Sequence, residues 1–223
     1  MKAMILSAGK GARMGSLTQN IPKPLLKIGN QTLLEIQLNK LIQAGISQFL
    51  INVSYLSDQI IEFVSNKYKD SSNLEIQFSE EDQPLETAGG IVNALEFFDD
   101  SPFLVTNADI FTDFDYSQLL KHKLSGNVSA FLILVPNPEF KMVGDYGLVG
   151  NKLSFTKDFT YSGIGLFRKE MFQRFKKGEK IKLKSILDDY ILNNKIDGSL
   201  YHGYWSDIGT TERLEFENKK NDN

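Results

Sequence analysis

The residues with the clearest chemical potential lie near the start of the chain. Gly9 and Gly11 alternate with Lys10 and are followed by Arg13, directly after a short apolar run at residues 3–6. Glycine lets backbone N–H groups approach an anion closely, and the lysine and arginine side chains add positive charge. This pattern predicts a loop that binds phosphate groups, with a purely structural Gly-x-Gly turn as the alternative.

A further cation, Lys23, lies between Pro22 and Pro24. Each proline fixes its own φ, and Pro24 disfavours helical backbone at the residue before it. We therefore expect Lys23 to be extended and to be presented to a phosphate from a stiff segment. A solvated lysine on a rigid turn fits the same residues equally well.

Two aspartates directly follow predicted strands. Asp109 comes after the apolar run 103–106, and Asp207 comes after the aromatic pair at 204–205. In open parallel sheets, ligands bind beyond the carboxyl ends of the strands, and carboxylates are hard oxygen ligands for Mg²⁺. Both aspartates are therefore candidate magnesium ligands, although Asp109 alone equally fits a residue that forms a turn.

Other residues near these positions have structural explanations. Asp113 and Asp115 precede a predicted helix and are expected to cap it, and Thr210 is the expected N-cap of the last helix. Trp205 is expected in the core. The small residues in 83–90 would let a base or ribose approach the start of a helix, and a tight contact between helix and sheet explains them as well.

The composition is that of an ordinary globular protein, and it excludes several kinds of site. The chain has 223 residues, of which 41% are hydrophobic and 24% charged, with a net charge of −3. This charge gives no sign of a nucleic-acid or membrane partner. There is no cysteine and there are two histidines, which excludes disulfides, thiol catalysis and histidine or cysteine metal clusters. No signal peptide or membrane-spanning run is found, so we expect a cytoplasmic protein.

Apolar runs alternate with helical patterns along the chain. Strands are expected at residues 3–6, 49–53, 74–78, 103–106, 128–135 and 161–167. Helices are expected at residues 32–44, 57–69, 88–98 and 115–124, the first ended by Gly45 as a C-cap residue. This alternation predicts an α/β fold with a mostly parallel sheet and helices on both faces, in a single domain of residues 1–223. Residues 136–157 are expected to form an insertion or lid over the sheet, and residues 217–223 to fray.

The glycine-rich loop invites comparison with dinucleotide-binding proteins. Their fingerprint has a third glycine where this chain has Met14, and an acidic residue at the end of a second strand about 20 residues further on. Residues 21–24 instead read Ile-Pro-Lys-Pro. A nicotinamide-dependent dehydrogenase is therefore disfavoured.

Five motifs follow one another along the chain: Gly-x-Gly-x-Arg-Met at 9–14, Pro-Lys-Pro-Leu at 22–25, Pro-Leu-Glu-Thr-Ala-Gly-Gly at 84–90, Asn-x-Asp at 107–109 and Trp-x-Asp-Ile-Gly-Thr at 205–210. Together they span nearly the whole chain and resemble the sugar-1-phosphate nucleotidyltransferases, or nucleotide-sugar pyrophosphorylases. The resemblance implies a Rossmann-like α/β/α sandwich of the nucleotide-diphospho-sugar transferase type. It also implies Mg²⁺-dependent attack of a sugar-1-phosphate oxygen on the α-phosphorus of a nucleoside triphosphate, which releases pyrophosphate.

The same resemblance implies roles for individual residues. Arg13, Lys23 and Asp109 would be catalytic, and Asp109 and Asp207 would hold Mg²⁺. The residues expected at the nucleotide are Ala8, Gly9, Lys10, Gly11, Ala12, Arg13, Lys23, Gln83 and Gly89. The residues expected at the sugar are Asn107, Gly144, Asp145, Ser162 and Gly163. The expected partners are small molecules, a nucleoside triphosphate and a sugar 1-phosphate, and the oligomeric state stays open.

Within the family, the compact length and residues 85–87 and 205–210 most resemble the uridylyltransferases that act on N-acetylmuramate α-1-phosphate in peptidoglycan recycling. Glu86 favours this branch, because many other branches have glycine there. The expected reaction converts UTP and that sugar to UDP-N-acetylmuramic acid and pyrophosphate. The alternatives are a mannose-1-phosphate guanylyltransferase, a glucose-1-phosphate thymidylyl- or uridylyltransferase, and a non-catalytic nucleotide-sugar-binding subunit. The last is motivated by Gly15 and Ala108, which depart from the family pattern.

Overall fold

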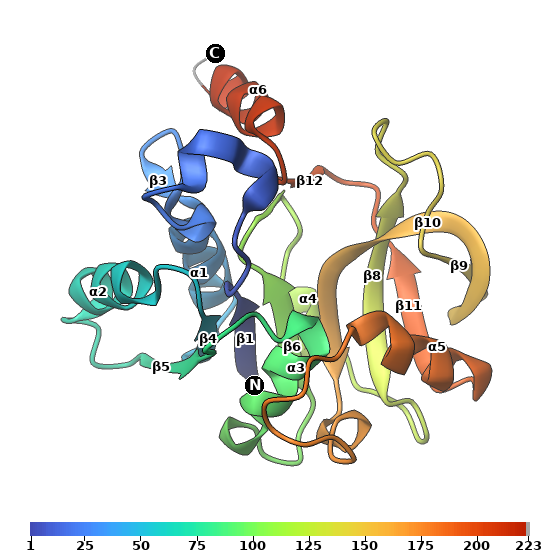
Figure 1. Cartoon of the computed structure of the whole chain (residues 1–223). Helices are drawn as coiled ribbons and strands as arrows, with labels where there is room; N and C mark the ends of the chain where they lie inside the picture. The colour runs from blue at the N-terminus through green and yellow to red at the C-terminus, as the bar shows by residue number, and fades with distance from the viewer. Residues whose placement is uncertain (222–223) are drawn as a thin grey trace.

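A central β-sheet of eight strands forms the middle layer of the molecule (Figure 1). The computed structural model describes residues 1–221. The strands of this sheet are β1 (Lys2–Leu6), β4 (Gln48–Val53), β5 (Glu75–Glu80), β6 (Phe103–Asn107), β8 (Ala130–Pro136), β9 (Tyr146–Val149), β10 (Lys152–Phe167) and β11 (Ile196–Leu200). Their order is β11-β8-β10-β6-β1-β4-β5, with β9 paired to β10. Strands β6, β1, β4 and β5 run parallel, whereas β10 is antiparallel to its neighbours β6 and β8.

Helices cover both faces of this sheet. They are α1 (Leu33–Gln43), α2 (Ser57–Tyr68), α3 (Glu86–Asn93), α4 (Ser117–Lys121), α5 (Leu183–Leu192) and α6 (Thr211–Asn221). Residues of α1, α2 and α4 share one hydrophobic cluster with the sheet, and residues of α3 and α5 share another. Helix α6 lies beyond the carboxyl end of β1 (Figure 1). The predicted α/β/α sandwich with a mostly parallel sheet is confirmed.

Alternating side chains of the strands supply the two clusters. In β1, Ala3 and Ile5 belong to the cluster on the α1 side, and Met4 belongs to the cluster on the α3 side, all of them fully buried. Burying one large apolar side chain stabilises the fold by roughly 1.5–3 kcal/mol. A shift of one residue would move each side chain to the opposite face, so burial fixes the position at which β1 ends.

Local signals at both ends of α1 explain its bounds. The Thr32 side chain accepts a hydrogen bond from the Glu35 N–H at 3.1 Å, as an N-cap residue does. At the other end Gly45 has φ 101°, a left-handed conformation that glycine adopts without strain. The N–H groups of Gly45 and Ile46 bond to the carbonyls of Ile42 and Leu41 at 2.9 and 3.0 Å. The predicted capping role of Gly45 is confirmed.

Short elements gather beyond the carboxyl ends of the parallel strands. They are the 3₁₀ helices η1 (Ala12–Thr18) and η2 (Lys23–Leu25), the hairpin of β2 (Lys27–Ile28) and β3 (Gln31–Thr32), and the pair of β7 (Ile110–Thr112) and β12 (Trp205–Asp207). A third hydrophobic cluster, which includes Met14, Leu26, Ile208 and Leu214, joins several of them to α6. Segments that are distant in sequence are thus held together at one edge of the sheet.

Three local expectations differ from the structure. Lys23 is not extended but begins η2, because the Leu26 N–H bonds to the Lys23 carbonyl at 3.0 Å, and the flanking Pro22 and Leu26 keep extended geometry. The helix expected at 115–124 is reduced to α4, since His122 has extended backbone with ψ 127°. The helix expected at 88–98 is α3 followed by the separate 3₁₀ turn η3 (Leu95–Phe97).

The segment 136–157 does not form a lid throughout. Residues of β9 pair with β10 and continue the sheet. Within 136–157, the residues that reach the cavity described below are Phe140, Lys141, Asp145 and Tyr146. Fraying from residue 217 is also wrong as far as Asn221, where α6 ends, and residues 222–223 lie outside the described residues. Among residues 1–221, no helix has the length and apolar character needed to span a membrane.

Candidate active site

Two adjoining cavities open at the carboxyl edge of the parallel strands, with volumes of about 460 and 450 Å³. The first lies between the glycine-rich loop and the start of α3, and the second lies between β10, β12 and the start of α5. The residues that line both are Leu6, Arg13, Glu86, Thr87, Asn107 and Asp109. Two ligands bound side by side would therefore meet at Arg13 and Asp109.

Asp109 lies at this junction and forms an ion pair with Lys23. It follows the last residue of β6 by two positions, and the Ala108 N–H donates to the Leu6 carbonyl at 3.0 Å, so the pairing with β1 continues up to the site. Both side chains are mostly buried, with 12% of the Lys23 side chain and 25% of the Asp109 side chain exposed. The sequence therefore correctly placed a lysine and a carboxylate beyond the strand ends.

Asp207 lies beside Asp109 because β12 pairs with β7. In this ladder Asp207 faces Ile110, and the Ile208 N–H donates to the Asp109 carbonyl at 2.8 Å. Burial raises the pKa of the Asp207 carboxyl above its usual value; the Arg213 guanidinium opposes this shift and the Asp109 charge adds to it. The two carboxylates thus share one small region although they are far apart in the sequence.

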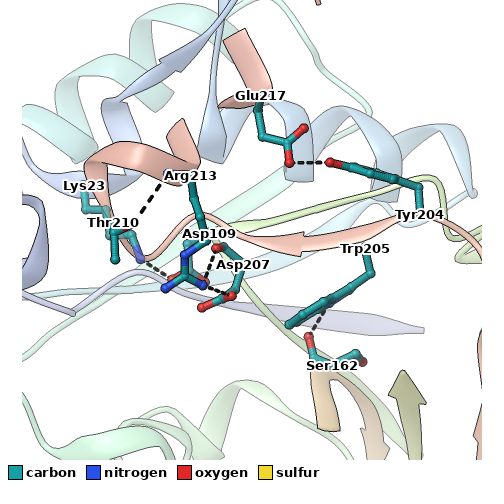
Figure 2. A network of polar contacts seen from close by, with 9 residues as sticks. All are labelled: Lys23, Asp109, Ser162, Tyr204, Trp205, Asp207, Thr210, Arg213 and Glu217. Atoms are coloured by element: carbon teal, nitrogen blue, oxygen red, sulfur yellow. Dashed lines mark hydrogen bonds and ion pairs between the residues drawn. The ribbon is translucent and has the colours of Figure 1, made fainter. Parts of the chain in front are cut away.

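Helix α6 holds β12 in this place (Figure 2). Arg213 donates to the Asp207 side chain and, at 3.0 Å, to the Asp207 carbonyl. One turn further on, Glu217 accepts a hydrogen bond from the Tyr204 hydroxyl. Thr210 accepts from the Arg213 N–H at 3.5 Å, as expected of an N-cap residue. Two residues of one helix, Arg213 and Glu217, therefore position the segment that carries Asp207.

The carboxylate pair fits Mg²⁺. Magnesium in proteins is commonly held by one or two carboxylates together with phosphate oxygens and waters. Within residues 1–221, no group of three or more acidic, histidine or cysteine side chains is arranged to hold a metal. Asp109 and Asp207 could therefore supply two ligands of a site that a bound phosphate would complete, and they do not form an all-protein cage.

The glycine-rich loop packs directly on Lys23. Gly11 has φ 65°, and a Cβ at this position would lie 3.0 Å from both the Lys23 Cβ and the Thr18 Cγ2. Any other residue would be strained and would push the loop away from the lysine. Arg13 follows in η1, and no carboxylate in the described part of the chain pairs with its guanidinium. The loop, Lys23 and Arg13 thus form one cationic wall.

A bulge in β10 shapes the second cavity. The register with β8 shifts between Tyr161 and Gly165, and Gly163 has φ 80°. A Cβ on Gly163 would lie 2.7 Å from the Asn107 Nδ2. The Trp205 Nε1 donates to the Ser162 carbonyl at 3.0 Å (Figure 2). Trp205 is half-buried and lines the second cavity, so it is not simply the core residue that was expected.

Most of the residues that the sequence assigned to substrates line these cavities. In the first are Ala8, Gly9, Gly11, Ala12, Arg13 and Lys23, and in the second are Asn107, Asp145, Ser162, Gly163 and Asp207. Lys10, Gln83, Gly89 and Gly144 are absent from both linings.

The two glycines outside the cavities have packing roles. The Gly89 N–H donates to the Ile181 carbonyl at 3.1 Å, and a Cβ there would lie 2.4 Å from the Glu179 carbonyl oxygen. A Cβ on Gly144 would lie 2.3 Å from the Phe159 carbonyl oxygen, because the chain approaches β10 closely at that point. Both glycines permit close approach of backbone to backbone. For Gly89 this is a structural role like the one considered for residues 83–90, but the contact is with residues 179–181 and not with the sheet.

Sequence reasoning missed a buried polar network below the first cavity. The Asn52 side chain accepts from the Ser7 N–H at 2.9 Å and donates to Glu81 at 2.7 Å. Glu81 also accepts from the Leu85 N–H at 2.9 Å, and burial raises the pKa of its carboxyl. The signal was present, since Asn52 is the only polar residue in the apolar run at 49–53. This network joins the loop after β1 to the start of α3.

Of the two departures from the family pattern, Ala108 lines the first cavity and Gly15 lines neither. Ala108 is buried and belongs to the core, and Gly15 has open space around its α-carbon. Glu86 has φ 63°, a left-handed conformation that is strained for any residue except glycine. Glu86 lines both cavities, so this strain is located at the junction of the two cavities.

Comparison with known proteins identifies the family. Residues 2–222 match the model of a family described as "Nucleotidyl transferase". The chain belongs to this family. It is 36% identical to the N-acetylmuramate alpha-1-phosphate uridylyltransferase of Neisseria meningitidis, over 96% of both chains. It is 28% identical to a mannose-1-phosphate guanyltransferase of Gibberella zeae over 94% of its own length, but it spans only 61% of that relative.

Solved structures show the same fold. A Bacillus anthracis structure described as a glucose-1-phosphate thymidylyltransferase superimposes with a TM-score of 0.86 at 18% identity, covering 99% of this chain and 94% of the other. With the family and these relatives, the chain is a sugar-1-phosphate nucleotidyltransferase. An enzyme of this class binds two substrates, and the structure has two adjoining cavities.

Proposed function

We propose that this nucleotidyltransferase transfers a uridylyl group from UTP to N-acetylmuramate α-1-phosphate, forming UDP-N-acetylmuramic acid and pyrophosphate in peptidoglycan recycling. The observation that carries the proposal is the pair of adjoining cavities that share Arg13 and Asp109. The choice of substrates is supported by the Neisseria relative, which matches along 96% of both chains. Residues 1–223 would act as a single domain in the cytoplasm, where nucleoside triphosphates are made.

The first cavity suits the nucleotide. Ala8 and Gly9 present backbone at its wall, where a base could approach closely, and Gly11 brings the loop onto Lys23. The triphosphate would lie against Arg13 and Lys23, with Lys180 on the opposite wall at the start of α5. Arginine presents a planar fork of donors to phosphate oxygens, which a lysine cannot reproduce. These contacts would neutralise the charge of the phosphates and orient the α-phosphorus toward the second cavity.

The second cavity suits the sugar 1-phosphate. Asn107, Ser162 and Gly163 provide polar groups beside the ring of Trp205, and such a mixture is typical of sugar binding. The phosphate of the sugar would lie at the Asp109 end, next to the triphosphate. Holding both reactants in one orientation removes most of the entropic cost of bringing them together.

The reaction forms one bond and breaks another at the α-phosphorus. An oxygen of the sugar phosphate attacks this phosphorus, the bond to the bridging oxygen of the β-phosphate breaks, and pyrophosphate leaves with that electron pair. The attacking oxygen is already anionic, so no general base is needed, and no histidine lines either cavity in residues 1–221. Arg13 and Lys23 would stabilise the negative charge that builds up on the phosphoryl oxygens.

Asp109 and Asp207 would hold Mg²⁺ at the junction. When bound, the ion supplies Lewis-acid stabilisation of phosphate charge. In the structure described here, Lys23 and Arg213 balance the charges of the two carboxylates. Burial raises the pKa of the Asp207 carboxyl, and the Arg213 guanidinium opposes this effect by favouring the ionised form that binds a cation.

A second candidate is a guanylyltransferase acting on mannose 1-phosphate. The mannose-1-phosphate guanyltransferases of several fungi match this chain at 27–30% identity, which favours the same chemistry on another pair of substrates. A non-catalytic binding subunit has less support, because Lys23, Asp109 and Asp207 are all retained and lie close together.

A substrate panel tests the proposal. Purified protein is incubated with Mg²⁺, one of UTP, GTP, CTP or dTTP, and one sugar 1-phosphate, and pyrophosphate release is measured. The sugars are the α-1-phosphates of N-acetylmuramate, N-acetylglucosamine, glucose and mannose. We expect the highest kcat/KM for UTP with N-acetylmuramate α-1-phosphate. A preference for GTP with mannose 1-phosphate would replace the proposed substrates, and tight nucleotide binding without turnover would favour a binding subunit.

A further inference from the structure

Most charged side chains around the second cavity are neutralised by a neighbour. The ion pairs at this cavity are Lys141–Asp145, Lys184–Asp188, Lys23–Asp109 and Arg213–Asp207. Two cations in its lining, Arg13 and Lys182, have no carboxylate partner within residues 1–221. Arg13 also lines the first cavity and is suited to the phosphates. Lys182 lines only the second cavity, so it faces the sugar and not the nucleotide.

The backbone on which Lys182 stands is firmly held. The neighbouring Ile181 N–H donates to the Leu85 carbonyl at 3.0 Å, and the Ile181 carbonyl accepts from the N–H groups of Ala88 and Gly89 at 3.0 and 3.1 Å. Lys182 itself has extended backbone and directly precedes α5. Three hydrogen bonds to the start of α3 thus fix the place from which this lysine reaches into the cavity.

A partner-free ammonium group on the sugar side favours an anionic group on the sugar. We propose that Lys182 is a specificity-determining residue that binds a carboxylate substituent of the acceptor sugar 1-phosphate. The inference rests on the proposed function and deepens it, because N-acetylmuramate carries a lactyl carboxylate that N-acetylglucosamine lacks. An ammonium group gains most from a carboxylate in a partly enclosed cavity, where water competes less for both charges.

Glu86 is the remaining charged residue on this wall without a partner. No ion pair joins it to Lys182 in the described part of the chain, so it leaves the lysine free. A carboxylate accepts hydrogen bonds, and Glu86 is therefore suited to the hydroxyl or amide N–H groups of a sugar. The cavity then offers an acceptor for the neutral groups of the sugar and a separate cation for its acidic group.

Two pairs of acceptors test the role of Lys182. N-acetylmuramate and N-acetylglucosamine 1-phosphates differ by the lactyl group, and glucuronate and glucose 1-phosphates differ by one carboxylate. We first determine which of the two pairs the wild-type enzyme uses better. For the carboxylated member of that pair, we expect Lys182→Met to lower kcat/KM roughly ten- to hundredfold. The uncharged member should change less than about threefold, and Lys182→Arg should restore most of the discrimination.

Two further variants control for charge and position. Lys177→Met also removes one positive charge, but Lys177 pairs with Glu96 on the surface, away from both cavities. Lys180→Met alters the other lysine beside Ile181, which lines the first cavity, and should raise the KM of the nucleotide for every acceptor alike. Lys182 is exposed, so we expect its replacement to leave the melting temperature nearly unchanged. Thermal melts of all variants test whether loss of folding causes any loss of activity.

The outcomes separate this inference from the proposed function. If Lys182→Met lowers kcat/KM equally for both members of a pair, Lys182 contacts the phosphate that they share. If kcat/KM changes for neither member, Lys182 does not contact the carboxylate. Either result overturns the inference. Preference for glucuronate 1-phosphate, lost in Lys182→Met, would overturn the proposed substrate and support the role of Lys182. A wild-type preference for the uncharged member of both pairs would overturn both.

Discussion

Two ion pairs lie in the candidate active site. Lys23 with Asp109 and Arg213 with Asp207 each join a cation to a carboxylate that faces the same small region. These side chains are mostly buried, and the cost of removing two charges from water offsets much of their attraction, so the net contribution of each pair to folding is small. In the proposed reaction their role would be chemical, since the carboxylates would bind the metal ion and Lys23 would bind a phosphate.

Replacing Asp109 should therefore separate activity from stability. For Asp109→Asn we expect turnover to fall at least about a hundredfold, because a ligand for the cation is lost while Lys23 keeps an oxygen acceptor. The melting temperature should change by less than about 3 °C. Asp113→Asn is the matched control, since Asp113 accepts from Tyr201 and lines neither cavity. Full activity of Asp109→Asn at an unchanged melting temperature would rule out Asp109 as a ligand.

At the scale of elements, irregular backbone shapes the site. The bulge in β10 places Ser162 and Gly163 in the second cavity, and η2 aims Lys23 at Asp109. The regular elements, such as β1 and α1, could be predicted from the periodicity of apolar residues in the sequence. The bulge could not be predicted, because it depends on contacts with distant segments such as β8 and Asn107. The 3₁₀ turn was missed because Pro24 disfavours helical backbone at Lys23, yet local hydrogen bonds close the turn there.

The bulge predicts that alanine is tolerated less well at Gly163, within β10, than at Gly150, in the turn between β9 and β10. Gly163 combines φ 80° with a contact that a Cβ would make 2.7 Å from Asn107, whereas Gly150 has φ 62° and open space. We expect Gly163→Ala to lower the free energy of unfolding by roughly 2–4 kcal/mol and Gly150→Ala by only about 1 kcal/mol. Urea denaturation measures both. Equal losses would mean that Asn107 moves aside and that the close approach does not require glycine.

At the scale of the whole molecule, the site joins segments that are remote in sequence. Its lining runs from Leu6 to Gly209, and α6 near the end of the described chain holds Asp207 against Asp109. The order of the motifs predicted this convergence, because parallel strands present their carboxyl ends at one edge. The roles of Arg213, Lys180 and Lys182 were not predicted, since a lysine or arginine in a helix or loop is usually a solvated residue.

Because the ligands would bridge these segments, they should stabilise the whole fold. With Mg²⁺ and UTP at about 100 times the dissociation constant, binding adds about 2.7 kcal/mol, which corresponds to a rise of roughly 5–10 °C in the melting temperature of a chain of this size. EDTA should remove most of this rise, and in Asp207→Asn the rise should no longer depend on Mg²⁺. Differential scanning fluorimetry with UTP alone, Mg²⁺ alone and both together measures each contribution. An identical rise in wild-type protein and Asp207→Asn, with the same response to EDTA, would mean that the cation binds the nucleotide without this carboxylate.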